Sequence, residues 1–147
     1  MALHAHDASD LASQLIVLTD RLKDLVKRET ALFEERRPHQ AMTFAGEKNT
    51  LATTYRLETA RIAQNPALLG GAPEKLRLAL RQATRELDSA LRANNRAAGA
   101  VRTLTEGLIK AIADEAVKMR QGVKGYGANG RVSAHDSAAA ITLNRQV

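Results

Sequence analysis

Residues 73–122 read PEKLRLALRQATRELDSALRANNRAAGAVRTLTEGLIKAIADEAVKMRQG, and the architecture of the whole chain follows from their pattern. No proline follows Pro73, and the only glycines before Gly122 are Gly99 and Gly107. Apolar or small residues recur at alternating steps of four and three, which is the narrow seam of a coiled coil. The seam consists of Leu76, Leu80, Ala83, Leu87, Ala90, Asn94, Ala97, Val101, Leu104 and Leu108. We therefore predict a helix roughly 70 Å long that begins at Pro73 and is closed by Gly122.

A first, shorter helix is predicted ahead of it, with Asp7, Ser9 and Asp10 as candidate N-caps and an end imposed by Pro38. Its seam is Leu11, Leu15, Leu18, Leu22, Leu25, Glu29 and Leu32. Glu29 occupies a position where leucine is expected. Two interpretations stay open: a carboxylate at a bundle end that reaches water or a cation, or a polar group that fixes helix register at a cost in stability.

A second helix is predicted from about His39 to Gln64, followed by a loop over residues 65–73 that contains two prolines and a Gly-Gly pair. Its seam is Phe44, Lys48, Leu51, Tyr55, Glu58 and Ile62. Two of these positions are charged. Lys48 and Glu58 are candidate partners for Glu29 and for an arginine of residues 73–122.

Together these patterns predict an all-α fold, an elongated antiparallel three-helix coiled-coil bundle with a long third helix. The bundle domain should span residues 1–122, and the glycine-rich residues 123–147 should form a flexible tail. The first two helices are each about 40 Å long, so about 30 Å of the third lacks a partner of matching length. A rival interpretation breaks the third helix between Asn94 and Gly99 and gives four helices of similar length.

Composition restricts the classes of function. The chain has 147 residues, a net charge of +6, 3% aromatic residues and no cysteine, which excludes disulfides and thiolate metal sites. No apolar run approaches the ~20 residues that span a bilayer, and the N-terminus lacks the layout of a signal peptide. We therefore expect a cytoplasmic protein without membrane insertion.

Enzyme motifs are absent, and the pair His4 and His6 is interpreted as surface. We expect no catalytic residue, metal, cofactor or small-molecule substrate, because an alanine-rich bundle offers no rigid polar pocket. Five arginines of the long helix lie close to one face, which is either solvated or a phosphate-contacting stripe. Interspersed acids and the lack of base-reading side chains favour the solvated face. These arginines are Arg77, Arg81, Arg85, Arg92 and Arg96.

Tyr126 stands among the glycines of residues 122–130 and is one of four aromatic residues in the chain. It is either an incidental residue of an unstructured tail or an anchor for a partner, a role that tyrosine often fills in interfaces.

Taken together, these features resemble the FlgN family of flagellar export chaperones. In the first helix the resemblance rests on Leu18, Leu22, Leu25, Glu29 and Leu32, and in the second on Lys48, Leu51, Leu57, Glu58 and Arg61. In the third it rests on Asn94 or Asn95 followed by Val101, Leu104 and Leu108, and after it on the segment from Tyr126 to Gly130. The proline-rich middle loop and the long tail depart from the family pattern.

The resemblance implies a cytoplasmic chaperone that binds the terminal helices of hook–filament junction proteins and delivers them to the flagellar type III export gate. The client-binding residues would be Val101, Leu104, Leu108, Ile112 and Met119. Docking on the cytoplasmic domain of the gate would use Tyr126, Gly127, Asn129 and Gly130. The alternatives are a homodimeric coiled-coil scaffold and a basic nucleic-acid-binding helical protein, although nucleic acid is not the partner we expect.

Overall fold

The computed structural model describes residues 2–126, with side chains described as far as residue 122. Three α-helices follow one another: α1 (Ala8–Glu34), α2 (Met42–Gln64) and α3 (Glu74–Tyr126). Two short 3₁₀ helices connect them, η1 (Pro38–Ala41) and η2 (Pro66–Leu69). No strand occurs in residues 2–126, and the predicted all-α fold is confirmed.

Helix α1 is closed at both ends by local hydrogen bonds. Asp7 is the N-cap, and its Oδ1 accepts a 2.8 Å hydrogen bond from the backbone N–H of Asp10. At the other end Arg36 N–H donates to Phe33 O and Arg37 N–H to Leu32 O, the paired bonds of a Schellman motif. Arg36 adopts φ 60°, a left-handed conformation that glycine usually supplies at this position. Pro38 then begins η1, which delays the start of α2 from the predicted His39 to Met42.

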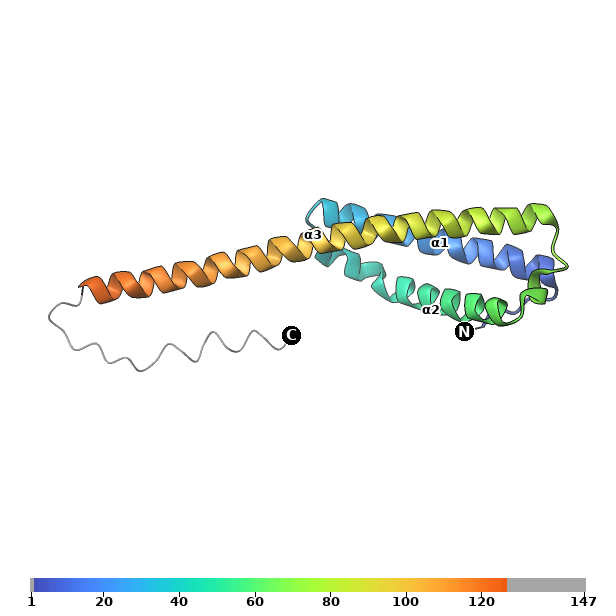
Figure 1. The fold of residues 1–147 in the computed structure, drawn as a ribbon, viewed down its shortest axis with the longest axis horizontal. Coiled ribbons are helices and arrows are strands. Elements are labelled where there is room, and N and C mark those ends of the chain that lie inside the picture. The colour runs from blue at the N-terminus through green and yellow to red at the C-terminus, as the bar shows by residue number, and fades with distance from the viewer. Residues whose placement is uncertain (1, 127–147) are drawn as a thin grey trace. The chain divides into compact units, whose positions relative to one another are not determined.

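The chain divides into two units, Met1–Leu104 and Thr105–Val147. In the first unit, α1, α2 and the N-terminal part of α3 lie side by side, with α2 antiparallel to the other two (Figure 1). The predicted arrangement of antiparallel neighbours is thus present here. In the second unit α3 continues to Tyr126.

The core of the first unit follows the predicted seams. Leu22 and Val26 of α1 pack with Leu87 and Ala90 of α3 in one cluster. A second cluster joins Leu15, Leu18 and Leu80, and takes in Leu3 from the segment before α1. Leu51 and Tyr55 of α2 pack against both clusters, so one face of α2 closes the core.

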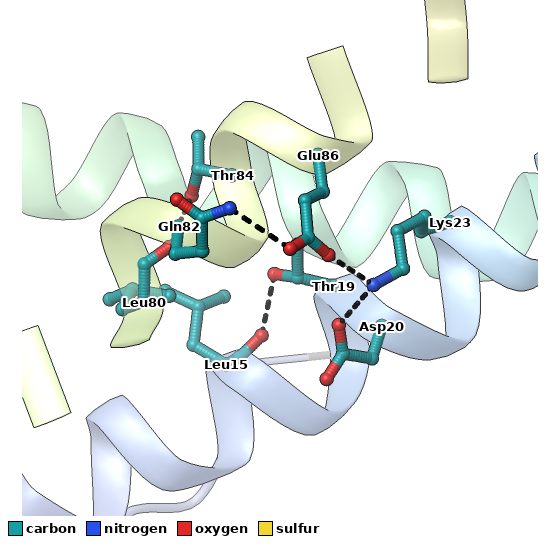
Figure 2. Close-up of polar contacts among 8 residues, drawn as sticks. All are labelled: Leu15, Thr19, Asp20, Lys23, Leu80, Gln82, Thr84 and Glu86. Carbon is teal, nitrogen blue, oxygen red and sulfur yellow. Dashed lines mark hydrogen bonds and ion pairs between the residues drawn. The ribbon is translucent and has the colours of Figure 1, made fainter. Parts of the chain in front are cut away.

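Polar contacts join the outer surfaces of the same helices. Arg21 of α1 holds both carboxylate oxygens of Glu47 of α2, at 2.7 and 3.0 Å. Lys23 of α1 donates to Glu86 of α3 at 2.7 Å and to Asp20 at 2.9 Å, as Figure 2 shows. Hydrogen bonds from Lys23 and then from Gln82 hold the pKa of Glu86 below its usual value. Arg21, Glu47 and Glu86 are each about half exposed, whereas only 13% of the Lys23 side chain is exposed. An exposed pair such as Arg21 and Glu47 orients the helices more than it stabilises them.

The third helix runs without a break from Glu74 to Tyr126, so the predicted continuous helix is confirmed and the rival four-helix interpretation, with a break between Asn94 and Gly99, is excluded. The predicted end of the helix is corrected, because the helix passes through Gly122 instead of ending there. No glycine in residues 2–126 has a positive φ, so Gly122 does not form the left-handed turn that closes a helix.

Candidate protein-interaction sites

A polar layer crosses the core of the first unit and takes residues from all three helices. Lys48 Nζ of α2 donates to Glu29 Oε1 of α1 at 2.6 Å. Asn94 Nδ2 of α3 donates to Glu29 Oε2 at 2.8 Å and to Thr30 Oγ1 at 3.2 Å. Glu29 is 8% exposed, so both carboxylate oxygens are satisfied inside the bundle. Lys48, which the sequence offered as a candidate partner, is thus bonded to Glu29, whereas the contact to Asn94 was not anticipated.

Glu58 is buried at 1% exposure, but its partners differ from the prediction. Its Oε1 accepts a 3.0 Å hydrogen bond from the backbone N–H of Leu3, from the segment that precedes α1. Its Oε2 lies 3.5 Å from Nη1 of Arg61, which is on the same helix, and has no hydrogen bond within the described residues. The candidate pairing of Glu58 with an arginine of α3 is therefore not observed. The N-terminal segment supplies the main partner, because Leu3 packs into the core beside this end of α2.

The five arginines of α3 that suggested a phosphate-contacting stripe are all exposed. Arg92 forms an ion pair with Asp88 of its own helix at 3.0 Å. Glu86 lies on the same helix and binds Lys23. The arrangement matches the solvated, mixed-charge face that was the favoured interpretation, because acids stand among the bases.

The predicted client-binding residues fall into both units. In the unit Met1–Leu104, Val101 is half-buried and Leu104 is exposed. In the other unit, Leu108 and Ile112 are each 62% exposed and Met119 is 68% exposed. Leu108, Ile112 and Met119 are spaced by four and seven residues and so lie on one face of α3. These three residues are called the apolar stripe below.

Further apolar side chains of the second unit are exposed as well. Ile109 lies beside the apolar stripe and is 62% exposed, and Val117 is also exposed. Between Thr105 and Gly122 no described side chain is buried. Large apolar groups left in water at helical spacing are typical of a surface that binds another protein.

One residue of this surface was missed in the sequence. Glu115 lies seven residues after Leu108, three after Ile112 and four before Met119, so it stands within the apolar stripe. Counting heptads onward from Asn94 reaches Leu108 at the second step and Glu115 at the third. That count could have identified it, but the prediction followed apolar residues alone.

The predicted docking residues lie at or past the limit of the described chain. Tyr126 is the last residue of α3, so its backbone is helical where a flexible segment was expected. Gly127, Asn129 and Gly130 lie outside the described residues.

Two further observations concern the part of the chain that the structure describes. None of its helices combines the length and the apolar sequence that crossing a membrane would require. No group of three or more His, Asp or Glu side chains is placed to hold a metal ion in those same residues.

Comparison with known proteins gives one full-length match. The flagellar basal-body protein FlbY of Caulobacter vibrioides is 43% identical over 148 residues, which cover 99% of each chain. The chain belongs to the FlbY family. No protein-family model matches the sequence, and no solved structure matches it.

Membership of the FlbY family makes the chain a flagellum-associated protein, which confirms the coarser part of the sequence interpretation. The finer part, a chaperone of the FlgN type, stays a prediction. Because the FlbY match extends over nearly the whole chain, it includes both the bundle and the exposed part of α3.

Proposed function

We propose that this FlbY-family chain is a cytoplasmic, non-enzymatic flagellar export chaperone. It binds the terminal helices of hook–filament junction proteins through the C-terminal half of α3 and delivers them to the export gate. The observation that carries the proposal is the apolar stripe, Leu108, Ile112 and Met119, exposed on a helix of a flagellum-associated protein.

An amphipathic client helix is the natural occupant of such a surface. A helix presents its apolar residues at the same three- and four-residue steps, so two helices can interdigitate along the stripe. Each leucine that becomes buried contributes about 1.5–3 kcal/mol from apolar area alone. Three or four such residues offset the entropy of association and still leave a complex that can release its client.

Docking on the export gate is assigned to the segment that starts at Tyr126 and includes Gly127, Asn129 and Gly130. The support is its sequence: a single aromatic residue among glycines, next to the helix that carries the apolar stripe. Glycines let the backbone approach a partner closely, and a single tyrosine beside them can anchor a transient contact. Separate sites for client and gate would let one chaperone hold both during transfer.

The test is copurification from the native bacterium, with the full chain carrying an affinity tag and the bound proteins identified by mass spectrometry. We expect the hook–filament junction proteins to be retained by the wild type and lost with Leu108→Asp. Retention of basal-body structural proteins alone, unchanged by that substitution, would contradict the chaperone function.

A second candidate is a homodimeric coiled-coil scaffold of the basal body. It is favoured by the heptad spacing of α3, which continues from Asn94 through Val101 to Leu108. The scaffold requires a stable dimer in the absence of any client. Sedimentation equilibrium of the purified chain distinguishes the two functions, because the chaperone is expected to be monomeric.

A further inference from the structure

We propose that Glu115 determines which helix the apolar stripe accepts, by requiring a lysine or arginine within the apolar seam of the partner. This inference rests on the proposed function and adds to it the chemistry of the client. It concerns one carboxylate in the middle of a surface otherwise built from Leu108, Ile112 and Met119.

The position of Glu115 makes it part of any contact along the stripe. It lies one turn beyond Ile112 and one turn before Met119, so a helix that covers both must also cover Glu115. Among residues 2–122, whose side chains the structure describes, Glu115 forms no ion pair, and even Lys118, three residues further on, is not bonded to it. A helix that packs here therefore removes water from the carboxylate of Glu115, which has no cationic partner among the described side chains.

The bundle shows how this chain accommodates the same situation. Glu29 also occupies a seam position, and it is buried only because Lys48 of the adjacent helix and Asn94 of α3 bond its two oxygens. Burying a carboxylate without such partners costs more free energy than one additional leucine contact returns. By the same physics, a partner helix that brings a cation to Glu115 is accepted, and a partner with an apolar or acidic residue there is rejected.

A second copy of the chain is a poor occupant for the same reason. In a parallel, in-register pair, Glu115 would face Glu115 of the other copy, and like charges opposed in a seam are destabilising. The occupant is thus a helix of another protein, amphipathic, with one basic residue at a central seam position.

The experiment measures binding of the full-length chain to two synthetic amphipathic peptides about four heptads long. They share a leucine seam and differ at one central seam position, lysine in one and glutamate in the other. The variants are Glu115→Lys and Glu115→Gln. The matched control is Glu106→Lys, the same charge change nine residues earlier, about half a turn round the helix from Glu115.

We expect the wild type to bind the lysine peptide at least ~10-fold more tightly than the glutamate peptide. Glu115→Lys should reverse the preference, Glu115→Gln should remove most of it, and Glu106→Lys should retain it. Equal affinity of the wild type for both peptides overturns the inference, as does a loss of preference in Glu106→Lys equal to that in Glu115→Lys.

The same three variants, measured against the hook–filament junction proteins of the native bacterium, separate this inference from the proposed function. If the junction proteins bind and Glu115→Lys changes nothing, the function stands and the inference fails. If they do not bind but the peptide preference reverses, the function fails and the role of Glu115 stands. If neither peptides nor junction proteins bind, or if a dimer dissociated by Leu108→Asp is found, both are overturned.

Discussion

The ammonium group of Lys48 lies 2.6 Å from Oε1 of Glu29 and joins α2 to α1 inside the bundle. Both residues stand at seam positions, where apolar side chains would give greater stability. With Asn94 bonded to the second carboxylate oxygen, the three helices have one alignment in which every member of the layer is satisfied. The register interpretation of Glu29 therefore has a structural basis, because sliding any helix by one turn would leave a buried charge unpaired.

Removing one partner of this layer should cost more than removing both. Lys48→Met leaves Glu29 buried without its cation and should lower the free energy of unfolding by about 2 kcal/mol. Adding Glu29→Leu should recover at least about 1 kcal/mol of that loss. Urea denaturation of the single and double variants measures the coupling. The exposed pair Arg21 and Glu47 is the control, expected to couple by less than about 0.5 kcal/mol.

Arg36 offers a stabilising substitution. Its φ of 60° costs a residue with a Cβ roughly 1–2 kcal/mol, so Arg36→Gly should raise the free energy of unfolding by about 0.5–1 kcal/mol after the added freedom of the unfolded chain is subtracted. The neighbouring Arg37, at φ −122°, gains nothing from glycine, and Arg37→Gly should destabilise. Thermal unfolding of the two variants checks the opposite signs; a stabilised Arg37→Gly would contradict the explanation.

Leu108→Asp should abolish binding of the junction proteins and leave the melting temperature of the monomer nearly unchanged, because Leu108 is exposed. Leu87→Ala is the contrasting variant: Leu87 is buried in the core, and its truncation should lower the free energy of unfolding by about 2–5 kcal/mol. Calorimetric titration and thermal scans of both variants supply the data. A large thermal loss in Leu108→Asp would show that Leu108 belongs to a core.

Tyr126→Ala should weaken binding to the cytoplasmic domain of the export gate at least ~10-fold, the equivalent of about 1.4 kcal/mol. Client affinity and folding should not change, because the tyrosine belongs to a separate site. Titration calorimetry with and without the client measures the two affinities independently. The two-site arrangement is wrong if gate affinity survives the substitution or if client affinity falls with it.

The contact between Lys23 and Glu86 predicts a pH dependence. Hydrogen bonds from Lys23 hold the pKa of Glu86 below its ordinary value of 4.5, so the folded state binds a proton less readily than the unfolded chain. The resulting stability is complete above about pH 4.5 and is lost as the pH falls through the lowered folded-state pKa. Glu86→Gln should therefore flatten the acid side of the stability profile, measured by urea denaturation between about pH 2 and 7. An acid limb that is the same in the wild type and in Glu86→Gln would contradict this explanation.

Much of the fold could be predicted from the sequence because the seams are regular. The predicted seam positions Leu15, Leu22 and Leu87 are buried, and Lys48, one of the candidate charged partners, meets Glu29. These successes share one cause: in a coiled coil, spacing along the chain determines which residues face the neighbouring helix.

The failures also share a cause, since they depend on contacts or conformations that spacing does not encode. Glu58 accepts a hydrogen bond from Leu3, which belongs to a segment without helical periodicity, so heptad spacing could not predict Leu3 as the partner. Gly122 was assigned a left-handed turn from residue type alone, yet it stays within the helix. Glu115 was missed because a charged residue in an apolar pattern looks like an interruption until a structure shows how its counterpart Glu29 is used.

Hydrogen exchange at the backbone amide of Leu3 can report when the N-terminal segment detaches from the first unit. Leu3 precedes α1, so its N–H is not part of a helix; it donates instead to the carboxylate of Glu58, a residue that is 1% exposed. Its proton can exchange with solvent only when the N-terminal segment lifts away from α2. If this amide exchanges faster than the amides of the core, the segment detaches locally; if it exchanges at the same rate as they do, the segment is released only when the three helices unfold together.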